Sequence, residues 1–152
     1  NILELGVYLG YSTIRILRNL DNYSKLTSIE SNKKFAEIAK EHIKISGLSE
    51  NHELLIGKTT QIIPTLDEKF DFIFIDHWKD LYLEDLKMLE RKKLIKHNAW
   101  IFADNVILFN LEDYLGYVRS SPNYQSKFIS TKREYSKSHP DGIEISIFKD
   151  EI

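Results

Sequence analysis

Short apolar runs alternate with longer segments of mixed polarity along most of this chain. Five runs have the length and composition of β-strands, and each ends at a glycine or at a polar or acidic residue. We expect these strands at residues 1–5, 26–29, 53–56, 70–75 and 99–103. The run 70–75 (F-D-F-I-F-I) is apolar enough to predict a central strand that is covered on both faces.

The segments between these runs space their apolar residues as helices do. We expect helices at residues 12–20, 32–46, 59–66, 81–91 and 111–120. In 32–46 the predicted buried face carries Phe35, Ile38, Ala39, His42 and Ile43, and Gly47 supplies a C-cap.

The end of the chain has a different pattern. Two further strands are expected at 124–130 and 142–148, joined by a polar loop that includes Pro140, Asp141 and Gly142. Strands and helices otherwise alternate, which favours a mostly parallel sheet with helices on both faces. The sequence therefore predicts one α/β domain over residues 1–152, with an antiparallel strand pair at its end.

Composition narrows the possible functions only in part. The chain has 152 residues, 42% hydrophobic and 29% charged, which is ordinary for a globular domain. Its formal net charge of −2 gives no electrostatic reason to expect nucleic acid or an anionic membrane as a partner. The absence of cysteine excludes disulfides, thiolate metal sites and a cysteine nucleophile.

The start of the sequence bears on localisation. No apolar run approaches the roughly 18 residues that cross a bilayer. Asn1 falls directly into a strand pattern, so we expect a preceding N-terminal segment, which could hold a signal or an anchor. Residues 1–152 themselves predict a cytoplasmic monomer without membrane contact.

The strand ends carry the candidate chemistry, because ligands of open α/β sheets bind at the carboxyl ends of the strands. Gly6 and Gly10 follow the first strand, where glycine permits a sharp turn and a close approach to a ligand. Taken alone, they also fit a tight strand-to-helix turn. Glu30 ends the second strand about 20 residues later, where a carboxylate can hold a ribose diol. With no phosphate-loop lysine, a nucleoside without phosphates fits best, and S-adenosylmethionine is the common one.

Asp76, Asp104 and Asn105 form a candidate metal site. They end the fourth and fifth strands, which we expect to be neighbours. Two carboxylates and an amide oxygen are hard donors that suit Mg²⁺. The alternative is that these residues cap helices, as Asp and Asn often do.

Three residues after Asp76 complete this region. Lys79 is a candidate general base, if a cation and burial lower its pKa, although most lysines that open helices are surface residues. His77 is a candidate metal ligand, a packed histidine or a cofactor contact. Trp78 offers an aromatic wall or simply core packing.

Several motifs together resemble the catechol O-methyltransferases over essentially the whole chain. They are L-E-L-G-V-Y-L-G-Y-S at 3–12, S-I-E at 28–30, D-H-W-K-D at 76–80, A-D-N at 103–105 and D-G-I-E at 141–144. The resemblance implies a Rossmann-like methyltransferase fold. It also implies methyl transfer from S-adenosylmethionine to one hydroxyl of a small-molecule catechol, such as a catecholamine or a related diphenol, with Mg²⁺ bound.

The resemblance also implies a role for each matching residue. Asp76, Asp104 and Asn105 are similar to the magnesium ligands, Lys79 to the base, and Glu144 to the carboxylate that binds the second catechol hydroxyl. The expected cofactor contacts are Glu4, Gly6, Tyr8 and Ser12 at the amino-acid end, Glu30 at the ribose, and Thr59, His77 and Trp78 beside the adenine or the methyl donor.

The chain departs from the family's pattern at two walls of the expected site. Thr59 and Thr60 replace a Ser-Gln pair, and residues 107–110 lack the Pro and Gly that follow A-D-N in the family. Two other functions therefore stay open. One is methylation of other vicinal diphenols such as caffeoyl esters, and the other is a non-catalytic scaffold.

Overall fold

A seven-stranded sheet forms the centre of the part of the chain that the computed structural model describes, residues 1–132 and 139–149. The strands are β1 (Ile2–Leu5), β2 (Leu26–Glu30), β3 (His52–Ile56), β4 (Phe70–Ile75), β5 (Ile95–Ala103), β6 (Tyr124–Lys132) and β7 (Pro140–Phe148). Their order is β3-β2-β1-β4-β5-β7-β6. The first five strands pair in parallel, whereas β7 runs antiparallel to both β5 and β6.

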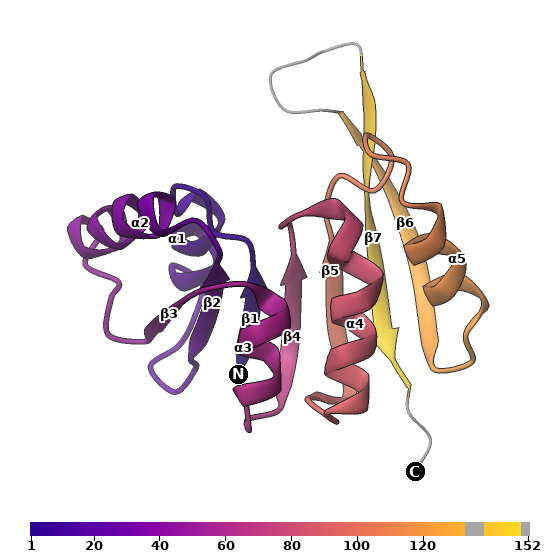
Figure 1. Cartoon of the computed structure of the whole chain (residues 1–152), viewed down its shortest axis with the longest axis horizontal. Helices are drawn as coiled ribbons and strands as arrows, with labels where there is room; N and C mark the ends of the chain where they lie inside the picture. The colour runs from indigo at the N-terminus through magenta and orange to yellow at the C-terminus, as the bar shows by residue number, and fades with distance from the viewer. Residues whose placement is uncertain (133–138, 150–152) are drawn as a thin grey trace.

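The helices divide between the two faces of the sheet. They are α1 (Tyr11–Leu17), α2 (Lys33–Ile45), α3 (Thr59–Ile62), α4 (Tyr82–Arg91) and α5 (Glu112–Ser120), with short 3₁₀ turns at Ile63–Thr65 and Lys79–Leu81. In Figure 1, α1 and α2 lie together beside β1 to β3, α4 lies over β4 and β5, and α5 lies beside β6. The predicted α/β sheet with an antiparallel C-terminal pair is thus confirmed. No helix of the described residues is long and apolar enough to cross a membrane.

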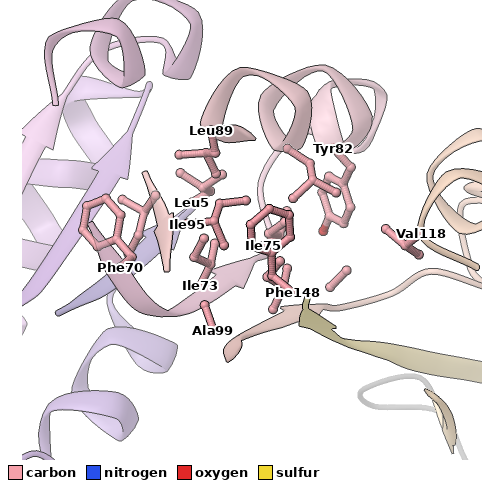
Figure 2. Close-up of a cluster of buried hydrophobic side chains, with 14 of the residues drawn as sticks. Leu5, Phe70, Ile73, Ile75, Tyr82, Leu89, Ile95, Ala99, Val118 and Phe148 are labelled. Carbon is pink, nitrogen blue, oxygen red and sulfur yellow. The ribbon is translucent and has the colours of Figure 1, made fainter. Parts of the chain in front are cut away.

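Two apolar clusters follow from the alternation of side chains along the strands. Leu5, Ile73 and Ile75 point to one face, where they pack beneath Leu89 and Tyr82 of α4 (Figure 2). A smaller cluster on the other face joins Leu17 of α1, Leu26 of β2 and Ile43 of α2. This arrangement fixes the strand register, since a slip of one residue would turn every apolar side chain to the wrong face.

The second face of β4 and β5 is less well covered. Phe72 and Phe74 pair in register with Trp100 and Phe102, and all four are only partly buried or exposed, with Trp100 at 47% exposure. The central position predicted for residues 70–75 is confirmed. The prediction that both of its faces are covered holds for only one face within the described residues.

Three local predictions were wrong. Pro140, Asp141 and Gly142 belong to β7 rather than to a loop, because the ladder continues to the pair Lys132–Pro140 and a proline is tolerated at the first position of a strand. The first helix ends at Leu17 instead of residue 20. In α2 the predicted Ala39 and Ile43 are buried, but the third buried residue is Ala36, which was not predicted.

Two residues that we expected on the buried face of α2 lie outside it. Ile38 is 43% exposed, and the exposed His42 turns its Nδ1 to the Leu9 carbonyl at 2.8 Å. The small Ala39 lets α2 approach the glycine loop closely, because a Cβ on Gly10 would lie only 3.3 Å from the Ala39 Cβ.

Candidate active site

The carboxyl ends of β4 and β5 bring the predicted metal residues together. Ile75 pairs with Ala103, so Asp76 and Asp104 follow neighbouring strands at the same level. Their backbones continue the ladder: the Asp76 N–H donates to the Leu5 carbonyl at 2.9 Å, and the Asp104 N–H donates to that of Ile75 at 3.0 Å. The predicted adjacency of these strands is confirmed.

Lys79 lies at the centre of this group. Its ammonium donates to Asp76 Oδ1 at 2.6 Å, to the Tyr82 hydroxyl at 2.7 Å and to Asn105 Oδ1 at 3.1 Å. Its side chain is only 14% exposed, and the rings of Tyr82 and Phe109 lie 5.0 and 5.4 Å from the ammonium. Lys79 is therefore a largely buried site residue and not a surface lysine.

Asn105 joins the two strands to β7. It adopts a left-handed backbone conformation (φ 56°), which asparagine tolerates better than most residues. Its N–H donates to Asp104 Oδ1 at 2.8 Å, and its side-chain amide donates to Asp141 Oδ2 at 3.0 Å. Asp141 is buried and was not among the predicted site residues, although it opens the D-G-I-E motif that we singled out.

The charges of this region fit a further cation. Burial raises the pKa of Asp104, and the nearby carboxylates of Asp76 and Asp141 raise it further, against the lowering effects of the Asn105 N–H and Lys79. Asp76 and Asp141 thus repel the charge of Asp104, and a divalent cation beside these carboxylates would reduce that repulsion.

The position of the ammonium indicates where such a cation would be held. The Lys79 ammonium, itself a cation, lies between the Oδ1 atoms of Asp76 and Asn105. Among the described residues, no group of three or more His, Cys, Asp or Glu side chains could hold a metal. The predicted donor set has a different composition, two carboxylates and one amide, and suits Mg²⁺. No helix takes a side-chain cap from these residues, since α4 and α5 have no side-chain cap hydrogen bond, which argues against the capping alternative.

A cavity of about 660 Å³ lies beside this cluster, over the ends of β1, β2 and β3. Six of the eight predicted cofactor residues line it: Gly6, Tyr8, Glu30, Thr59, His77 and Trp78. Asp76 lines both this cavity and a second one of about 450 Å³, which Ser12 and Asp104 also line. The predicted cofactor and metal residues therefore share one wall.

The glycine loop is shaped by close backbone packing. Gly6 has φ 94°, and a Cβ there would lie 2.6 Å from the Asp76 carbonyl oxygen. Only glycine lets the loop approach the backbone of residues 76 and 77 so closely.

Glu30 holds this loop from the second strand. Its Oε2 accepts from the N–H groups of Val7 and Tyr8 at 3.1 and 2.9 Å, and its Oε1 accepts from the Asn32 N–H at 2.8 Å. The carboxylate is buried and bonded to the loop, so Glu30 is not a solvent-exposed residue at the end of its strand. Its role toward a ribose stays a prediction.

Glu4 is fully buried beneath the loop and lines neither cavity. Its carboxylate accepts hydrogen bonds from the hydroxyls of Ser12, Thr13 and Ser28 at 2.6 to 2.7 Å. Burial raises the pKa of Glu4, and the three hydroxyls oppose that rise. Ser12 thus contacts Glu4 directly, and the predicted contact of Glu4 with the cofactor stays a prediction.

His52 extends this buried network and gives it a pH dependence. Its Nε2 lies 3.0 Å from Ser28 Oγ, whose own proton goes to Glu4, and burial lowers the pKa of His52 from 6.5 to about 4. Between these values the unfolded chain binds a proton that the folded chain does not, so stability falls as the pH drops from 6.5 toward 4.

We expect His52→Gln, which keeps a donor but does not titrate, to lose less stability on acidification than the wild type. The difference at pH 4 should be about 1–3 kcal/mol, since the partial exposure of His52 reduces the full effect of the pKa shift. Urea unfolding of both proteins at pH 7, 5.5 and 4 measures it. Parallel losses in the two proteins would show that His52 does not control this pH dependence.

The other cofactor candidates have distinct surroundings. The His77 Nε2 lies 2.7 Å from Oδ2 of the buried Asp85, and the His77 ring stacks on Tyr82 with centroids 5.2 Å apart. His77 is therefore held as a packed histidine at the cavity wall rather than as part of the metal group. Trp78 is 74% exposed, so it is not a core residue.

Thr59 differs from both, because it offers an unused polar group. It is 5% exposed, and within the described residues its hydroxyl has no hydrogen-bond partner. A buried polar atom without a partner is costly, so a ligand in the adjoining cavity that bonds to it would gain binding energy.

Glu144 is a predicted site residue whose side chain is paired with α5 and not with the metal group. Its side chain is 1% exposed, and both carboxylate oxygens accept from Arg119 of α5, at 2.9 and 2.7 Å. Its neighbour Ile143 lines the 450 Å³ cavity instead. The role of Glu144 toward a catechol stays a prediction.

The order of the strands, the glycine loop and the ligand cavities together define a Rossmann-like methyltransferase fold. A profile of the O-methyltransferase family matches residues 1–133, so the chain belongs to that family. The predicted resemblance to catechol O-methyltransferases is confirmed by its curated relatives.

Two such relatives and one solved structure show the extent of the similarity. Catechol O-methyltransferase B of Danio rerio is 40% identical over 97% of this chain, which spans 57% of that protein. Catechol O-methyltransferase of Sus scrofa is 37% identical over 97% of this chain, which spans 82% of that protein. The structure of the O-methyltransferase TomG from Streptomyces achromogenes in complex with SAM is 25% identical, with a TM-score of 0.88 over 97% of this chain and 72% of that one.

Proposed function

We propose that this chain carries the active site of a Mg²⁺-dependent O-methyltransferase that methylates one hydroxyl of a catechol with S-adenosylmethionine. The observation that supports this most is the hydrogen-bonded group formed by Asp76, Lys79 and Asn105, of which Asp76 lines the 660 Å³ cavity. In this proposal the group supplies a base and hard oxygen donors next to a cavity that suits a nucleoside-containing cofactor.

The chain's own residues supply position and charge in this proposal. Asp76, Asp104 and Asn105 would hold the Mg²⁺, whose positive charge stabilises a phenolate oxygen and favours the neutral amine of Lys79. The neutral amine takes the proton of the reacting hydroxyl. The new O–CH₃ bond then forms as the S–CH₃ bond breaks, and the sulfonium becomes a neutral thioether. The protein contributes orientation and electrostatic complementarity.

The cofactor residues are proposed from the cavity and from the family. Glu30, Thr59 and Trp78 line only the 660 Å³ cavity, to which we assign the nucleoside, whereas Gly6 and Tyr8 line both cavities. The related TomG structure is a complex with SAM, and this supports the same cofactor here. The predicted monomer and cytoplasmic location stay predictions.

The substrate class is tested by direct comparison. Initial rates of methyl transfer to small catechols and to a caffeoyl thioester, each with Mg²⁺ and with a chelator, should show preference for the catechol and dependence on the metal. Preference for the thioester would favour the caffeoyl alternative. Calorimetry that shows no binding of either S-adenosylmethionine or Mg²⁺ would favour the scaffold.

A further inference from the structure

Tyr82 is a fully buried phenol that connects three parts of the site. Its hydroxyl accepts from the Lys79 ammonium at 2.7 Å and donates to the backbone carbonyl of Asp104 at 3.1 Å. Its ring stacks on His77, with an angle of 10° between the planes. One side chain therefore contacts the candidate base, the backbone of a candidate metal ligand and the wall of the cofactor cavity.

We propose that Tyr82 is a positioning residue, which holds the Lys79 amine at the catalytic centre through its hydroxyl. This inference rests on the proposed function of Lys79. Lysine has a long and flexible side chain, so its amine needs fixed contacts to stay in one place. Asp76 and Asn105 supply two of these contacts, and both would turn to a bound cation. The hydrogen bond from Lys79 to the Tyr82 hydroxyl is the contact that a bound cation would leave in place.

The geometry of the hydroxyl makes this role specific. Its single proton points to the Asp104 carbonyl, so a lone pair faces the nitrogen of Lys79 whether that nitrogen is charged or neutral. Tyr82 starts α4, whose inner face is anchored in the main apolar cluster by Leu86 and Leu89. The anchor is therefore rigid, as a positioning residue requires.

The chain offers a matched control for removing this hydroxyl. Tyr114 is also buried, packs edge-on against Tyr82 at 5.8 Å, and has a hydroxyl without a hydrogen-bond partner in the described residues. Tyr82→Phe should lower kcat about tenfold and change the Kd of S-adenosylmethionine less than twofold. Tyr114→Phe should leave both values within about twofold of the wild type.

A double-mutant cycle separates positioning from a general effect on the fold. If Tyr82 acts through Lys79, Tyr82→Phe should cost less than about twofold in a Lys79→Met background. The same tenfold loss in both backgrounds would overturn the proposal. Circular dichroism and unfolding midpoints confirm that all variants are folded at the assay temperature.

A second readout does not depend on methyl transfer. In ¹H–¹⁵N spectra of the lysine side chains, the Lys79 ammonium is identified by its loss in Lys79→Met. Tyr82→Phe should accelerate its hydrogen exchange and broaden or remove the signal, and Tyr114→Phe should not. An unchanged signal in Tyr82→Phe would overturn the proposal. If the wild type fails to methylate any catechol, the proposed function fails, and the spectra still decide whether Tyr82 holds Lys79.

Discussion

Asp104→Ala should abolish Mg²⁺-dependent methyl transfer while the Kd for S-adenosylmethionine changes less than about twofold. The Asp104 carboxylate lines the 450 Å³ cavity and not the cofactor cavity, and its hydrogen bond is to the N–H of the next residue. A metal ion stabilises a transition state by several kcal/mol, so losing one of its ligands should lower kcat on the order of a thousandfold. Initial rates over a Mg²⁺ titration and calorimetry with the cofactor measure the two quantities.

Two further variants make this result specific. Asp104→Asn keeps an oxygen that can accept from the Asn105 N–H, so it tests the loss of charge without the loss of that bond. Asp113→Ala removes an exposed carboxylate from the first turn of α5 and should be as active as the wild type. Normal turnover of Asp104→Ala would remove Asp104 from the metal site. Loss of cofactor binding would instead show that the Asp104 carboxylate supports the cofactor site.

The sequence predicted the fold well because buried parallel strands are continuous apolar runs between polar strand ends. The clearest example is β4, whose bounds match the prediction at both ends. The start of β5 was missed by four residues, since Lys96, His97 and Asn98 are polar and lie where the register with β4 shifts. Such an irregularity depends on pairing with another strand, which the pattern of one segment does not show.

The sequence predicted those candidate site residues that directly follow the ends of strands. Asp76, Asp104 and Asn105 follow directly from the ends of two neighbouring strands, and Lys79 lies one turn beyond. Tyr82 was not singled out for a role, because an apolar residue at the start of a helix looks like core. Its contact with the Asp104 carbonyl joins residues 22 positions apart and exists only in the folded chain.

Glu144 shows the limit of a motif. The D-G-I-E sequence predicts which residues stand on the last strand but not what each carboxylate contacts. Asp141 turned out to bond Asn105, 36 positions earlier, whereas Glu144 is paired with Arg119 of α5. Both partners come from distant parts of the sequence, and Arg119 takes both oxygens that the predicted catechol contact of Glu144 would need.

Lys79→Met should lower kcat at neutral pH by about 10²–10⁴-fold, the usual contribution of a general base. Methionine keeps most of the length of the side chain and can pack near the rings of Tyr82 and Phe109, so the fold of the site should persist. The loss should shrink as the pH rises toward about 10, where phenols ionise without a base. Values of kcat between pH 7 and 10 for both proteins measure this convergence.

The same substitution elsewhere on α4 provides the control. The Lys87 ammonium also lies over an aromatic ring, 4.7 Å from the centroid of Tyr117, and Lys87→Met should leave kcat unchanged. Lys79→Arg separates a base from a fixed positive charge, because arginine stays protonated and cannot accept the hydroxyl proton. We expect it to be as slow as Lys79→Met at neutral pH. A rate close to that of the wild type would show that Lys79 acts through its charge, and the proton would then have to leave through another group.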